Sequence, residues 1–549
     1  MSIEPTGLFF WARSGGGHRT AKEGIKQQKI KEYAAQGRRL DTSFDVDITG
    51  PKVLGFLGDW AVNAWDSAQR RGDLSYLERH AWWGWLAEFF MYPIVYFRTK
   101  WMLQSLSVEP EFVVSTQAFC INAIVSAMRT VNHEKGWNMR MDVHLTDMPS
   151  KKASHFFPSI RKLSNDDELC KMVTLHAPKP IIKPTESEEE FWQRHIGKVK
   201  VITDDTYPIR QAFLDTEALK NVLFQPTYEV PIRLNRPEEG PLNTTIKQED
   251  KVAMLMLGSV PTTEAVHEWL KLFARESKEA ADKQRTHHFF LYCGQPGSEL
   301  WHSVKAELSK LELPANCNIV PFTDQDDTVI APLMARCDMS ITRSGGLTSM
   351  ELIQLAYADI PKRPDKKVLI HSEGLFFPKP EPKPAKEFVK SIITEVATHM
   401  AKKRLLSSPE WQNVRTKMQA YLITLGYNKQ QSIEITEKVL EYYAYNDQNA
   451  PLKPLEETFK ELQAEAAKFS QENPTSRALI TAQMQKMMQK QAYKDLDLSS
   501  LRKLAIQRVL IKEGIVLWEG GNAKYLTKAI NAEITNPHYA KESMRAFFS

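Results

Sequence analysis

Short runs of β-branched and aromatic residues alternate with amphipathic stretches along most of the chain. In the second half, this alternation predicts strands at residues 252–257, 288–293, 318–320 and 339–342. Helices are predicted to follow these strands at 262–277, 300–311, 329–337 and 348–356. The first half shows strand-like segments at 7–11, 44–48, 112–115, 141–145 and 199–202, with a helix from the first glycine-rich turn to about residue 35. Strands that alternate with helices predict open parallel sheets covered by helices on both faces.

Breaks in this pattern suggest where the domains end. Residues 226–250 hold four prolines and little apolar periodicity, which favours a linker. A second proline-rich break, PKPEPKP, lies at 378–384, and the composition beyond residue 451 is helix-forming. The predicted division is an N-terminal Rossmann-like domain at 1–234, a second at 250–385, helices packing on this core at 386–450 and a helical appendage at 451–549. A chain ending near residue 445 is therefore expected to keep both of the first two domains and any ligand site that they form.

Composition excludes several classes of protein. Of the 549 residues, 42% are hydrophobic and 25% charged, which is typical of folded multidomain proteins. A net charge of +5 is too small over this length to indicate a nucleic-acid partner. The five cysteines form no CxxC pair, so no metal site is expected and a reducing compartment fits best. No secretory signal or clean membrane span is evident. The expected location is cytoplasmic, with peripheral membrane association or signal-less secretion left open.

The first chemical feature is the glycine-rich loop SGGGHR at 14–19, between a predicted strand and a predicted helix. Glycines let the backbone approach a ligand closely, and the free N–H groups of a helix start favour negative charge. The loop lacks the ending of a Walker A motif and the spacing of GxGxxG. Gly16, Gly17 and Arg19 are candidate donor ligands, and His18 is a candidate catalytic base. The alternative is a flexible turn with a structural histidine.

The second chemical feature is the segment TRSGGLTSME at 342–351, which again joins a strand to a helix. Its backbone N–H groups, together with the hydroxyls of Ser344 and Thr348, are suited to a diphosphate. Glu351 lies one turn into the helix, where a carboxylate can accept both hydroxyls of a ribose. The alternative is an ordinary capped helix start with a favourable acidic residue in its first turn.

Together the two segments resemble the paired signatures of a glycosyltransferase family. GGGHR and RSGGLTSMEL look like those of the family that contains the lipid II-forming N-acetylglucosaminyltransferase and the monogalactosyldiacylglycerol synthases. Further similar segments follow in the same order: VVSTQAFCIN, TDMPSKKASHFFP, TYPIRQAF, MLGS, YCGQ and MARCDMSITRSGG. TYPIRQAF resembles the Pro-x-Arg segment near the domain junction, although EVPIR at 229–233 is an alternative. The resemblance covers about residues 7 to 375 and does not include the tail.

This resemblance implies a GT-B fold, in which two Rossmann-like domains face a cleft, and inverting transfer without a metal. It places His18 at the acceptor or the phosphate and Glu351 at the ribose. It implies that Glu373 binds a sugar hydroxyl. The donor-binding residues at the diphosphate and in the adjoining loops are expected to be Gly258, Ser259, Arg343, Ser344, Gly345, Gly346, Leu347 and Thr348. Should His18 not be the base, Asp147 is the next carboxylate to consider.

The chemistry agrees with these implications. An unperturbed imidazole pKa near ~6.5 suits the removal of a hydroxyl proton at neutral pH. Helix N-termini and loop amides can stabilise a leaving diphosphate without a metal. Asp45 and Asp47 imitate a DxD metal motif, but they alternate with apolar residues as on one face of a strand. We therefore expect the UDP-sugar donor as a substrate and no metal or other cofactor.

Two segments bear on the acceptor. Nine aromatic residues crowd positions 82–101, which predicts either core packing or an interfacial helix for a lipid acceptor. The stretch 477–545 carries twelve basic and six acidic residues and could bind a membrane or a partner, although a solvated helical face is the commoner explanation. The function predicted is transfer of a hexosyl or N-acetylhexosaminyl group from a UDP-sugar to a hydroxyl of a lipid or protein. The alternatives are a nucleotide-sugar epimerase or hydrolase and a nucleotide-sugar-binding scaffold without turnover.

Overall fold

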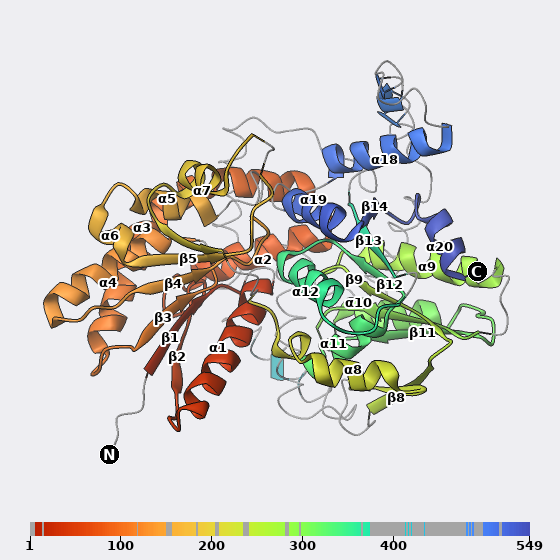
Figure 1. The fold of residues 1–549 in the computed structure, drawn as a ribbon, viewed down its shortest axis with the longest axis horizontal. Helices are drawn as coiled ribbons and strands as arrows, with labels where there is room; N and C mark the ends of the chain where they lie inside the picture. Colours follow the sequence, from red (N-terminus) through yellow and green to blue (C-terminus); the bar gives the residue numbers. More distant parts are fainter. Residues whose placement is uncertain are drawn as a thin grey trace. The chain divides into compact units, whose positions relative to one another are not determined.

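The chain divides into two compact units, one formed by residues 1–379 with 475–549 and the other by 380–474. The computed structural model describes most of the first unit (Figure 1). The described ranges are 6–13, 16–117, 119–149, 156–182, 185–203, 208–233, 241–279, 285–295, 298–363, 366–373, 498–514 and 519–548, with scattered positions between 412 and 487. The helices predicted at 386–450 lie outside the described residues apart from those positions.

The N-terminal domain is built on a parallel sheet with the strand order β2-β1-β3-β4-β5-β6. Its strands are β1 (Thr6–Trp11), β2 (Asp41–Asp47), β3 (Phe112–Ser115), β4 (Met141–His144), β5 (Val173–Ala177) and β6 (Lys200–Thr203). The helices between them are α1 (Gly17–Ala35), α2 (Phe56–Arg70), α3 (Leu74–Ser105), α4 (Ile121–Lys135), α5 (Phe156–Leu163), α6 (Asp167–Lys171) and α7 (Glu188–Ile196). The strand order reverses between β1 and β3, and ligands of such sheets bind at the carboxyl ends flanking that point.

The second domain repeats this design with the strand order β11-β10-β9-β12-β13-β14. Its strands are β9 (Lys251–Met256), β10 (His287–Tyr292), β11 (Cys317–Phe322), β12 (Met339–Thr342), β13 (Lys367–His371) and β14 (Glu533–Thr535). The helices of this domain are α9 (Thr263–Glu279), α10 (Glu299–Leu308), α11 (Asp327–Arg336), α12 (Gly346–Tyr357), α18 (Leu498–Gly514), α19 (Glu519–Ile530) and α20 (Lys541–Phe548). Here the order reverses between β9 and β12, so residues 257–259 and 343–346 emerge at the switch point.

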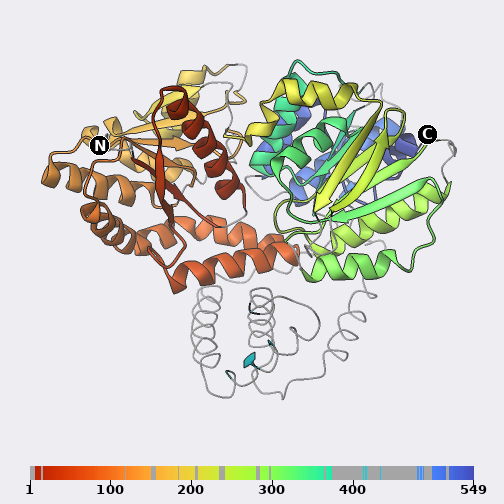
Figure 2. The same ribbon diagram turned by 90° about the horizontal axis from the view of Figure 1, so that it is seen from below.

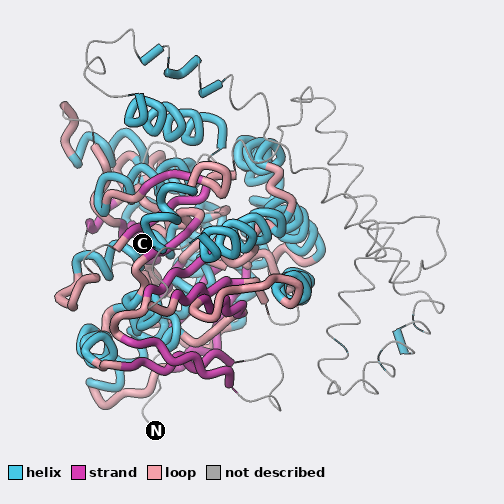
Figure 3. Tube along the Cα trace, turned by 90° about the vertical axis from the view of Figure 1, so that its right-hand side faces the viewer, coloured by secondary structure: helices cyan, strands magenta, loops and turns pink. Residues whose placement is uncertain are grey.

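The predicted fold class is confirmed by this topology, because both sheets are parallel and doubly wound like a Rossmann domain. Figure 3 shows the strands of the sheets with helices around them. In the second half, each predicted strand occurs within two residues of its predicted bounds. Central strands are buried, as the continuous apolar runs predicted: all six residues of β10 have low exposure. Strand β5 was not predicted, because threonine and histidine interrupt the apolar residues of its VTLHA pattern.

The linker predicted at 226–250 is wrong. Residues Thr227–Arg233 form β7 and Pro241–Lys247 form β8, an antiparallel pair (Figure 2). Prolines are tolerated because each strand of a two-stranded sheet has an edge whose N–H groups need no partner in the sheet. Val230, Ile232 and Ile246 are buried in the core of the second domain, so alternate positions of the hairpin supply core side chains.

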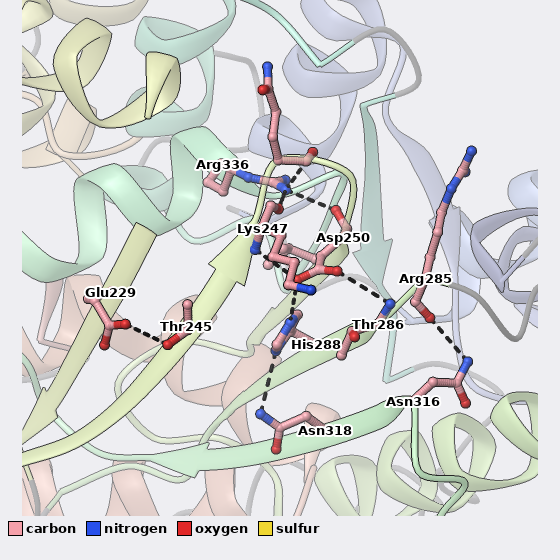
Figure 4. Close-up of polar contacts among 12 residues, drawn as sticks. Glu229, Thr245, Lys247, Asp250, Arg285, Thr286, His288, Asn316, Asn318 and Arg336 are labelled. Atoms are coloured by element: carbon pink, nitrogen blue, oxygen red, sulfur yellow. Dashed lines mark hydrogen bonds and ion pairs between the residues drawn. The ribbon is translucent and has the colours of Figure 1, made fainter. Parts of the chain in front are cut away.

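A buried polar cluster ties this hairpin to the second sheet (Figure 4). The Asp250 carboxylate accepts hydrogen bonds from the backbone N–H of Lys247 at 2.8 Å and from His288 Nε2 at 3.1 Å. Arg336 Nη2 donates to the backbone carbonyls of Lys247 at 2.7 Å and Asp250 at 2.9 Å. Because Asp250 directly precedes β9 and His288 lies in β10, the hairpin is fixed to two central strands of that sheet.

The segment before the hairpin also packs with the second domain. Ile209, Phe213 of the short 3₁₀ helix η1 (Gln211–Phe213) and Leu219 of α8 (Thr216–Phe224) are buried in the same core as β9 and α12. Residues 208–233, assigned to the N-terminal domain by the boundary predicted at 234, therefore share the hydrophobic core of the second domain. A boundary placed by proline content alone could not reveal this packing.

The end of the chain is an integral part of the second domain. β14 extends the sheet next to β13, with Leu369 opposite Glu533 and His371 opposite Thr535. Helix α19 packs against α12, and α20 packs against α9, as Figure 1 also shows. Phe548 of α20 meets Phe273 of α9 with ring centroids 5.4 Å apart. The helices expected after residue 451 are present at 498–548, but the three-residue strand and its place in the sheet were not foreseen.

Candidate functional site

His18 lies in the first turn of α1, at the switch point of the N-terminal sheet. Its Nδ1 is 2.6 Å from the carbonyl oxygen of Thr116, the residue directly after β3. A carbonyl only accepts, so Nδ1 donates and the lone pair of the neutral ring is on Nε2. The hydroxyl of Thr146, two residues after β4, lies 3.1 Å from the same Nδ1. The ring orientation and the tautomer are thus set by groups from two other strand ends, which leaves Nε2 as the atom able to accept a proton.

Asp147 is the buried carboxylate of the site. It follows β4 directly after Thr146, and only 7% of its surface is exposed. Its Oδ1 accepts a hydrogen bond of 3.0 Å from Asn522 Nδ2 in α19. Burial raises the pKa of Asp147, and the hydrogen bond from Asn522 and the charge of His18 oppose this only in part. Asp147 and His18 are therefore electrostatically linked.

The glycine loop of the second domain lies against Asp147. A Cβ added at Gly346 would come 1.9 Å from the carbonyl oxygen of Thr146 and 2.5 Å from Asp147 Oδ1. No side chain fits there, since real Cβ atoms essentially never approach backbone atoms so closely. Gly346 is the first residue of α12, so this approach brings the start of that helix to the catalytic candidates of the other domain.

The two glycine loops also approach through a second contact. Gly16 has a φ of 70°, in the left-handed region, and caps α1. A Cβ at this position would lie 2.6 Å from the side chain of Ser259, which follows β9. Helices α1 and α12, which begin at the two loops, contact each other further along. The predicted candidates from the two domains are therefore neighbours in space.

Glu351, the residue predicted to bind a ribose, already has a protein partner in the structure. It is fully buried, and its two oxygens accept hydrogen bonds from Arg210 Nε at 2.7 Å and Nη2 at 2.8 Å. Burial lowers the pKa of Arg210, but the negative charge and hydrogen bonds of Glu351 outweigh this and raise it. To contact a ribose, Glu351 would have to exchange this bidentate partner. Because α12 begins at Gly346, Glu351 lies in the second turn of the helix.

This ion pair bears on the choice between the two Pro-x-Arg segments. Pro208-Ile209-Arg210 precedes η1, which contacts both α1 and α12. The carbonyl of Ile209 lies so close to Gly24 of α1 that a Cβ there would come within 2.4 Å of it. The alternative segment at 229–233 lies in β7 of the hairpin instead. Arg210 is the candidate that reaches the helix of the second glycine loop.

Arg343 and Glu373, both predicted donor ligands, are buried and bonded to each other. Arg343 Nη2 donates to Glu373 Oε1 at 2.7 Å and to Thr262 Oγ1 at 2.5 Å. Burial would raise the pKa of Glu373, but the charge of Arg343 and the interaction with His371 lower it to about 2. Trp269 Nε1 donates to His371 Nδ1 at 3.2 Å, which leaves the His371 proton on Nε2, 3.4 Å from Glu373 Oε2. These groups form a buried ion-pair cluster beneath the loop, and neither charge is exposed toward a ligand.

The other predicted donor residues lie around the two switch points. Gly345, Gly346, Leu347 and Thr348 are half-buried at the start of α12, and Gly258 and Ser259 are half-buried after β9. Ser344 is buried and has a φ of 58°, a left-handed conformation that is uncommon for a residue with a side chain. In the first loop Gly17 and Arg19 belong to α1, with Arg19 exposed, whereas residues 14 and 15 lie outside the described residues.

The aspartates that imitate a metal motif each hold basic side chains. Asp45 pairs with Lys22 at 2.5 Å and accepts from the indole of Trp11. Asp47 pairs with Arg13 at 2.5 Å. In the described ranges, no group of three or more His, Cys, Asp and Glu side chains is arranged to hold a metal ion.

Asn522 is a site residue that the sequence analysis missed. It is fully buried, and its side-chain oxygen accepts a 2.7 Å hydrogen bond from the backbone N–H of Met148 while its nitrogen bonds Asp147. The residue lies 375 positions from Asp147. No motif surrounds it, and one asparagine in a helix-forming tail carries no signal that separates it from surface asparagines.

The aromatic segment divides between core and solvent. Val95 and Leu103 of α3 are buried, while Phe89, Phe90, Phe97 and Trp101 expose 52–69% of their surface. The side chains of residues 78–86, which include three of the tryptophans, lie outside the described residues. Although α3 spans 32 residues, no helix in the described ranges is long and apolar enough to cross a membrane.

Comparison with known proteins adds little to this picture. No family model matches the sequence, and no curated protein matches it. Among solved structures, MurG of Acinetobacter baumannii aligns over 80% of this chain and 99% of its own, with 12% identity and a TM-score of 0.31. A UDP-forming trehalose-phosphate synthase of Burkholderia xenovorans aligns over 82% and 100%, with 10% identity and a TM-score of 0.35. Arabidopsis thaliana UGT89C1 complexed with UDP-L-rhamnose aligns over 67% and 80%, with 9% identity and a TM-score of 0.33. At such TM-scores the similarity carries no argument, and the fold assignment rests on the sheet topology.

Proposed function

We propose that this protein transfers a hexosyl or N-acetylhexosaminyl group from a UDP-sugar to a hydroxyl acceptor, with inversion and without a metal. The observation that carries the proposal is His18 at the start of α1, with Nδ1 bonded to the Thr116 carbonyl and Asp147 and Gly346 close by. This constellation joins a base to the start of a helix suited to an anion. His18 comes from the first glycine loop and Gly346 from the second, so the two domains each supply one part.

In the proposed reaction, Nε2 of His18 takes the proton of the acceptor hydroxyl. The acceptor oxygen forms a bond to the anomeric carbon from the face opposite the diphosphate, and the bond from that carbon to UDP breaks. Asp147 stabilises the imidazolium that forms, since its charge and that of His18 favour each other. The N–H groups at the start of α12, from Gly346 to Thr348, stabilise the charge that develops on the leaving UDP.

The decisive assay measures UDP release from a panel of UDP-sugars with and without a lipid or protein acceptor. Release that requires the acceptor supports transfer, and release without it indicates a hydrolase. If a UDP-sugar raises the melting temperature of the protein but no UDP is released, the protein binds the nucleotide sugar without turnover and is a scaffold. We expect activity to persist in EDTA. Complete loss that Mn²⁺ or Mg²⁺ restores would contradict metal independence.

A lipid acceptor at an anionic membrane surface fits the exposed side of α3. Phe90, Ile94, Phe97 and Trp101 recur at intervals of four, three and four, which places them on one helical face. Arg98 is exposed beside them, with its guanidinium 6.0 Å from the Trp101 ring centroid. Aromatic side chains with a flanking cation favour the interface of a membrane that contains anionic lipid.

Sedimentation with vesicles tests this surface. Phe90→Ser combined with Trp101→Ser should release the protein from vesicles containing phosphatidylserine, because it removes the two ends of the stripe. The matched control is Phe224→Ser, which replaces a phenylalanine of α8 that is 70% exposed. Equal sedimentation of the double variant and the control would exclude α3 as the contact and favour a soluble acceptor.

A further inference from the structure

The end of the chain reaches the catalytic candidates of the N-terminal domain through one helix. Helix α19 packs on α12 and places Asn522 between Asp147 and Met148. A second side chain of the same helix, Tyr525, donates through its hydroxyl to the carbonyl of Lys179 at 3.0 Å. The tail therefore contacts the N-terminal domain both at the proposed centre and away from it.

The Asn522 amide can take only one orientation. Its Nδ2 donates to Asp147 Oδ1 at 3.0 Å, and its Oδ1 accepts from the Met148 N–H at 2.7 Å. A flip would set oxygen against carboxylate oxygen and NH₂ against N–H, two repulsive contacts in a site without exposure to water. The pair of bonds holds the Asp147 side chain to the backbone of its own neighbour.

We propose that Asn522 is a positioning residue, which holds Asp147 beside His18 and the Gly346 loop, so that the C-terminal tail completes the catalytic centre. The inference rests on the proposed function, in which Asp147 stabilises the His18 imidazolium. Asp147 Oδ1 has two close neighbours. Asn522 of α19 donates a hydrogen bond to it, and Gly346 of α12 lies so close that no side chain would fit there. Because these two helices pack on each other, the tail sets both the carboxylate and the helix start that faces it.

Asn522→Asp is the direct test, since it keeps the shape and the acceptor for Met148 but removes the donor to Asp147. We expect kcat to fall on the order of 10²-fold, the cost of misplacing a group in a preorganised site. The KM for the donor should change much less than kcat, because the side-chain hydrogen bonds of Asn522 go to Asp147 and Met148 and not to the loop groups proposed to hold the diphosphate. Tyr525→Phe, which removes the hydrogen bond of the Tyr525 hydroxyl to the carbonyl of Lys179, is the matched control and should keep kcat near wild type.

The pH dependence distinguishes positioning from simple tethering. His18 of α1 is a titratable group that acts on Asp147, whereas the neighbouring Asn522 and Gly346 are neutral. A second carboxyl group at 522 raises the pKa of the pair, so the acidic limb of kcat/KM should move to higher pH. A purely structural role would lower the amount of folded enzyme without moving this limb.

Thermal denaturation gives a readout independent of activity. At about pH 5, one carboxyl of the Asn522→Asp pair can stay protonated and donate to the other, whereas near pH 8 both ionise and repel. The melting temperature lost relative to wild type should therefore grow with pH. Asn522→Leu, similar in size and uncharged, replaces Asn522→Asp if the latter does not fold, and the same loss of kcat is expected.

The outcomes separate the two proposals. Wild-type protein that releases no UDP from any UDP-sugar overturns the proposed function. The melting curves then test only whether Asn522 and Asp147 are hydrogen-bonded. Active wild-type protein with unchanged kcat and pH profile in Asn522→Asp overturns the positioning role. An equal loss of kcat in Tyr525→Phe also overturns it, because the tail would then act only as a tether.

Discussion

His18 shows how a single hydrogen bond assigns a chemical role. The Thr116 carbonyl accepts from Nδ1 at 2.6 Å, and this fixes the proton on that atom whatever else approaches the ring. Imidazole with its lone pair on Nε2 can act as a base, while the opposite tautomer could not do so from the same position. Glu351 and Glu373 show the converse, since arginine partners occupy carboxylates that their sequence positions offered to a ligand.

We predict that His18→Ala and His18→Gln lower kcat by ~10² to 10⁴, the usual contribution of a general base, with little change in donor affinity. Gln keeps a hydrogen bond but cannot take the proton. Rates from an acceptor-dependent UDP assay and donor affinity from calorimetry provide the measurement. Thr116→Val, which removes a hydroxyl bonded to the His18 carbonyl but keeps the Thr116 carbonyl, is the control. Near-normal turnover in both His18 variants would make the histidine structural.

Glu351→Ala is expected to destabilise the fold as well as to weaken any binding of UDP. The change leaves the Arg210 guanidinium buried without its bidentate partner, which typically costs about 3–5 kcal/mol. The free energy of unfolding in urea measures this loss. The double variant Arg210→Met with Glu351→Leu should recover much of it. A single variant as stable as wild type would show that the ion pair does not persist in solution.

The buried Glu373 predicts a pH dependence of stability. Its pKa is lowered from 4.5 in a model compound to about 2 by Arg343 and His371, against the effect of burial. A depressed carboxylate pKa stabilises the fold above the unfolded pKa, and this contribution of about 3 kcal/mol is lost as pH falls from about 4.5 to 2. Urea titrations at several pH values should show the slope in wild type and a flatter one in Glu373→Gln. Parallel slopes would contradict the low pKa.

At the scale of elements, the two glycine loops are connected to one another by the helices that follow them. Both α1 and α12 begin at a switch point, and a glycine at each start approaches the opposite domain: Gly16, which caps α1, and Gly346, the first residue of α12. Helix starts carry unpaired N–H groups, so the proposed site gathers two of them beside Asp147. The buried cluster of Arg343 and Glu373 lies under the second loop and supports the strained Ser344 next to it.

The glycines of the second loop offer a matched pair of variants. Gly346→Ala places a Cβ 1.9 Å from the Thr146 carbonyl, so the loop and the N-terminal strand end must separate. We expect turnover to fall at least tenfold. The affinity for UDP should fall by a smaller factor, because the other N–H groups at the start of α12 remain. Gly345→Ala is the control, since its φ of −57° suits alanine and no atom lies within 4 Å of the added Cβ. Equal activities would show that the Gly346 approach is not needed in catalysis.

At the scale of the whole molecule, the second domain is completed by residues far along the chain. The sheet that begins at β9 ends with β14, 282 positions after Lys251 of that first strand by residue number, and α20 buries Phe547 and Phe548 on α9. The segment before β9 belongs to the same core through η1, α8 and the hairpin. The second domain is thus assembled from two stretches of chain, one that runs from η1 to β13 and one at 498–548.

A chain ending at residue 445 is therefore expected to lose donor binding, contrary to the expectation from sequence. Truncation removes β14 from the edge of the sheet. It also uncovers Phe273, which packs against Phe548, and the core residues of α12 that share a hydrophobic cluster with Leu526. Differential scanning calorimetry should show a lower melting temperature or no cooperative transition, and UDP affinity should fall with it. A truncated protein with wild-type stability and UDP binding would show that the tail is dispensable for the second domain.

The sequence by itself determined the local elements and the two loops. Periodicity and glycines are local properties, so most strands, the helices after them, and the candidates His18 and Gly346 could be placed without tertiary information. The hairpin was misassigned because its prolines mimic a linker. Strand β5 was missed because polar residues interrupt its apolar pattern, and β14 has only three residues. Only the tertiary structure decided the partners: Arg210 for Glu351, Arg343 for Glu373 and Asn522 for Asp147. These pairs join residues 30 to 375 positions apart, and burial and charge neutralisation, which select them, leave no periodic trace in the sequence.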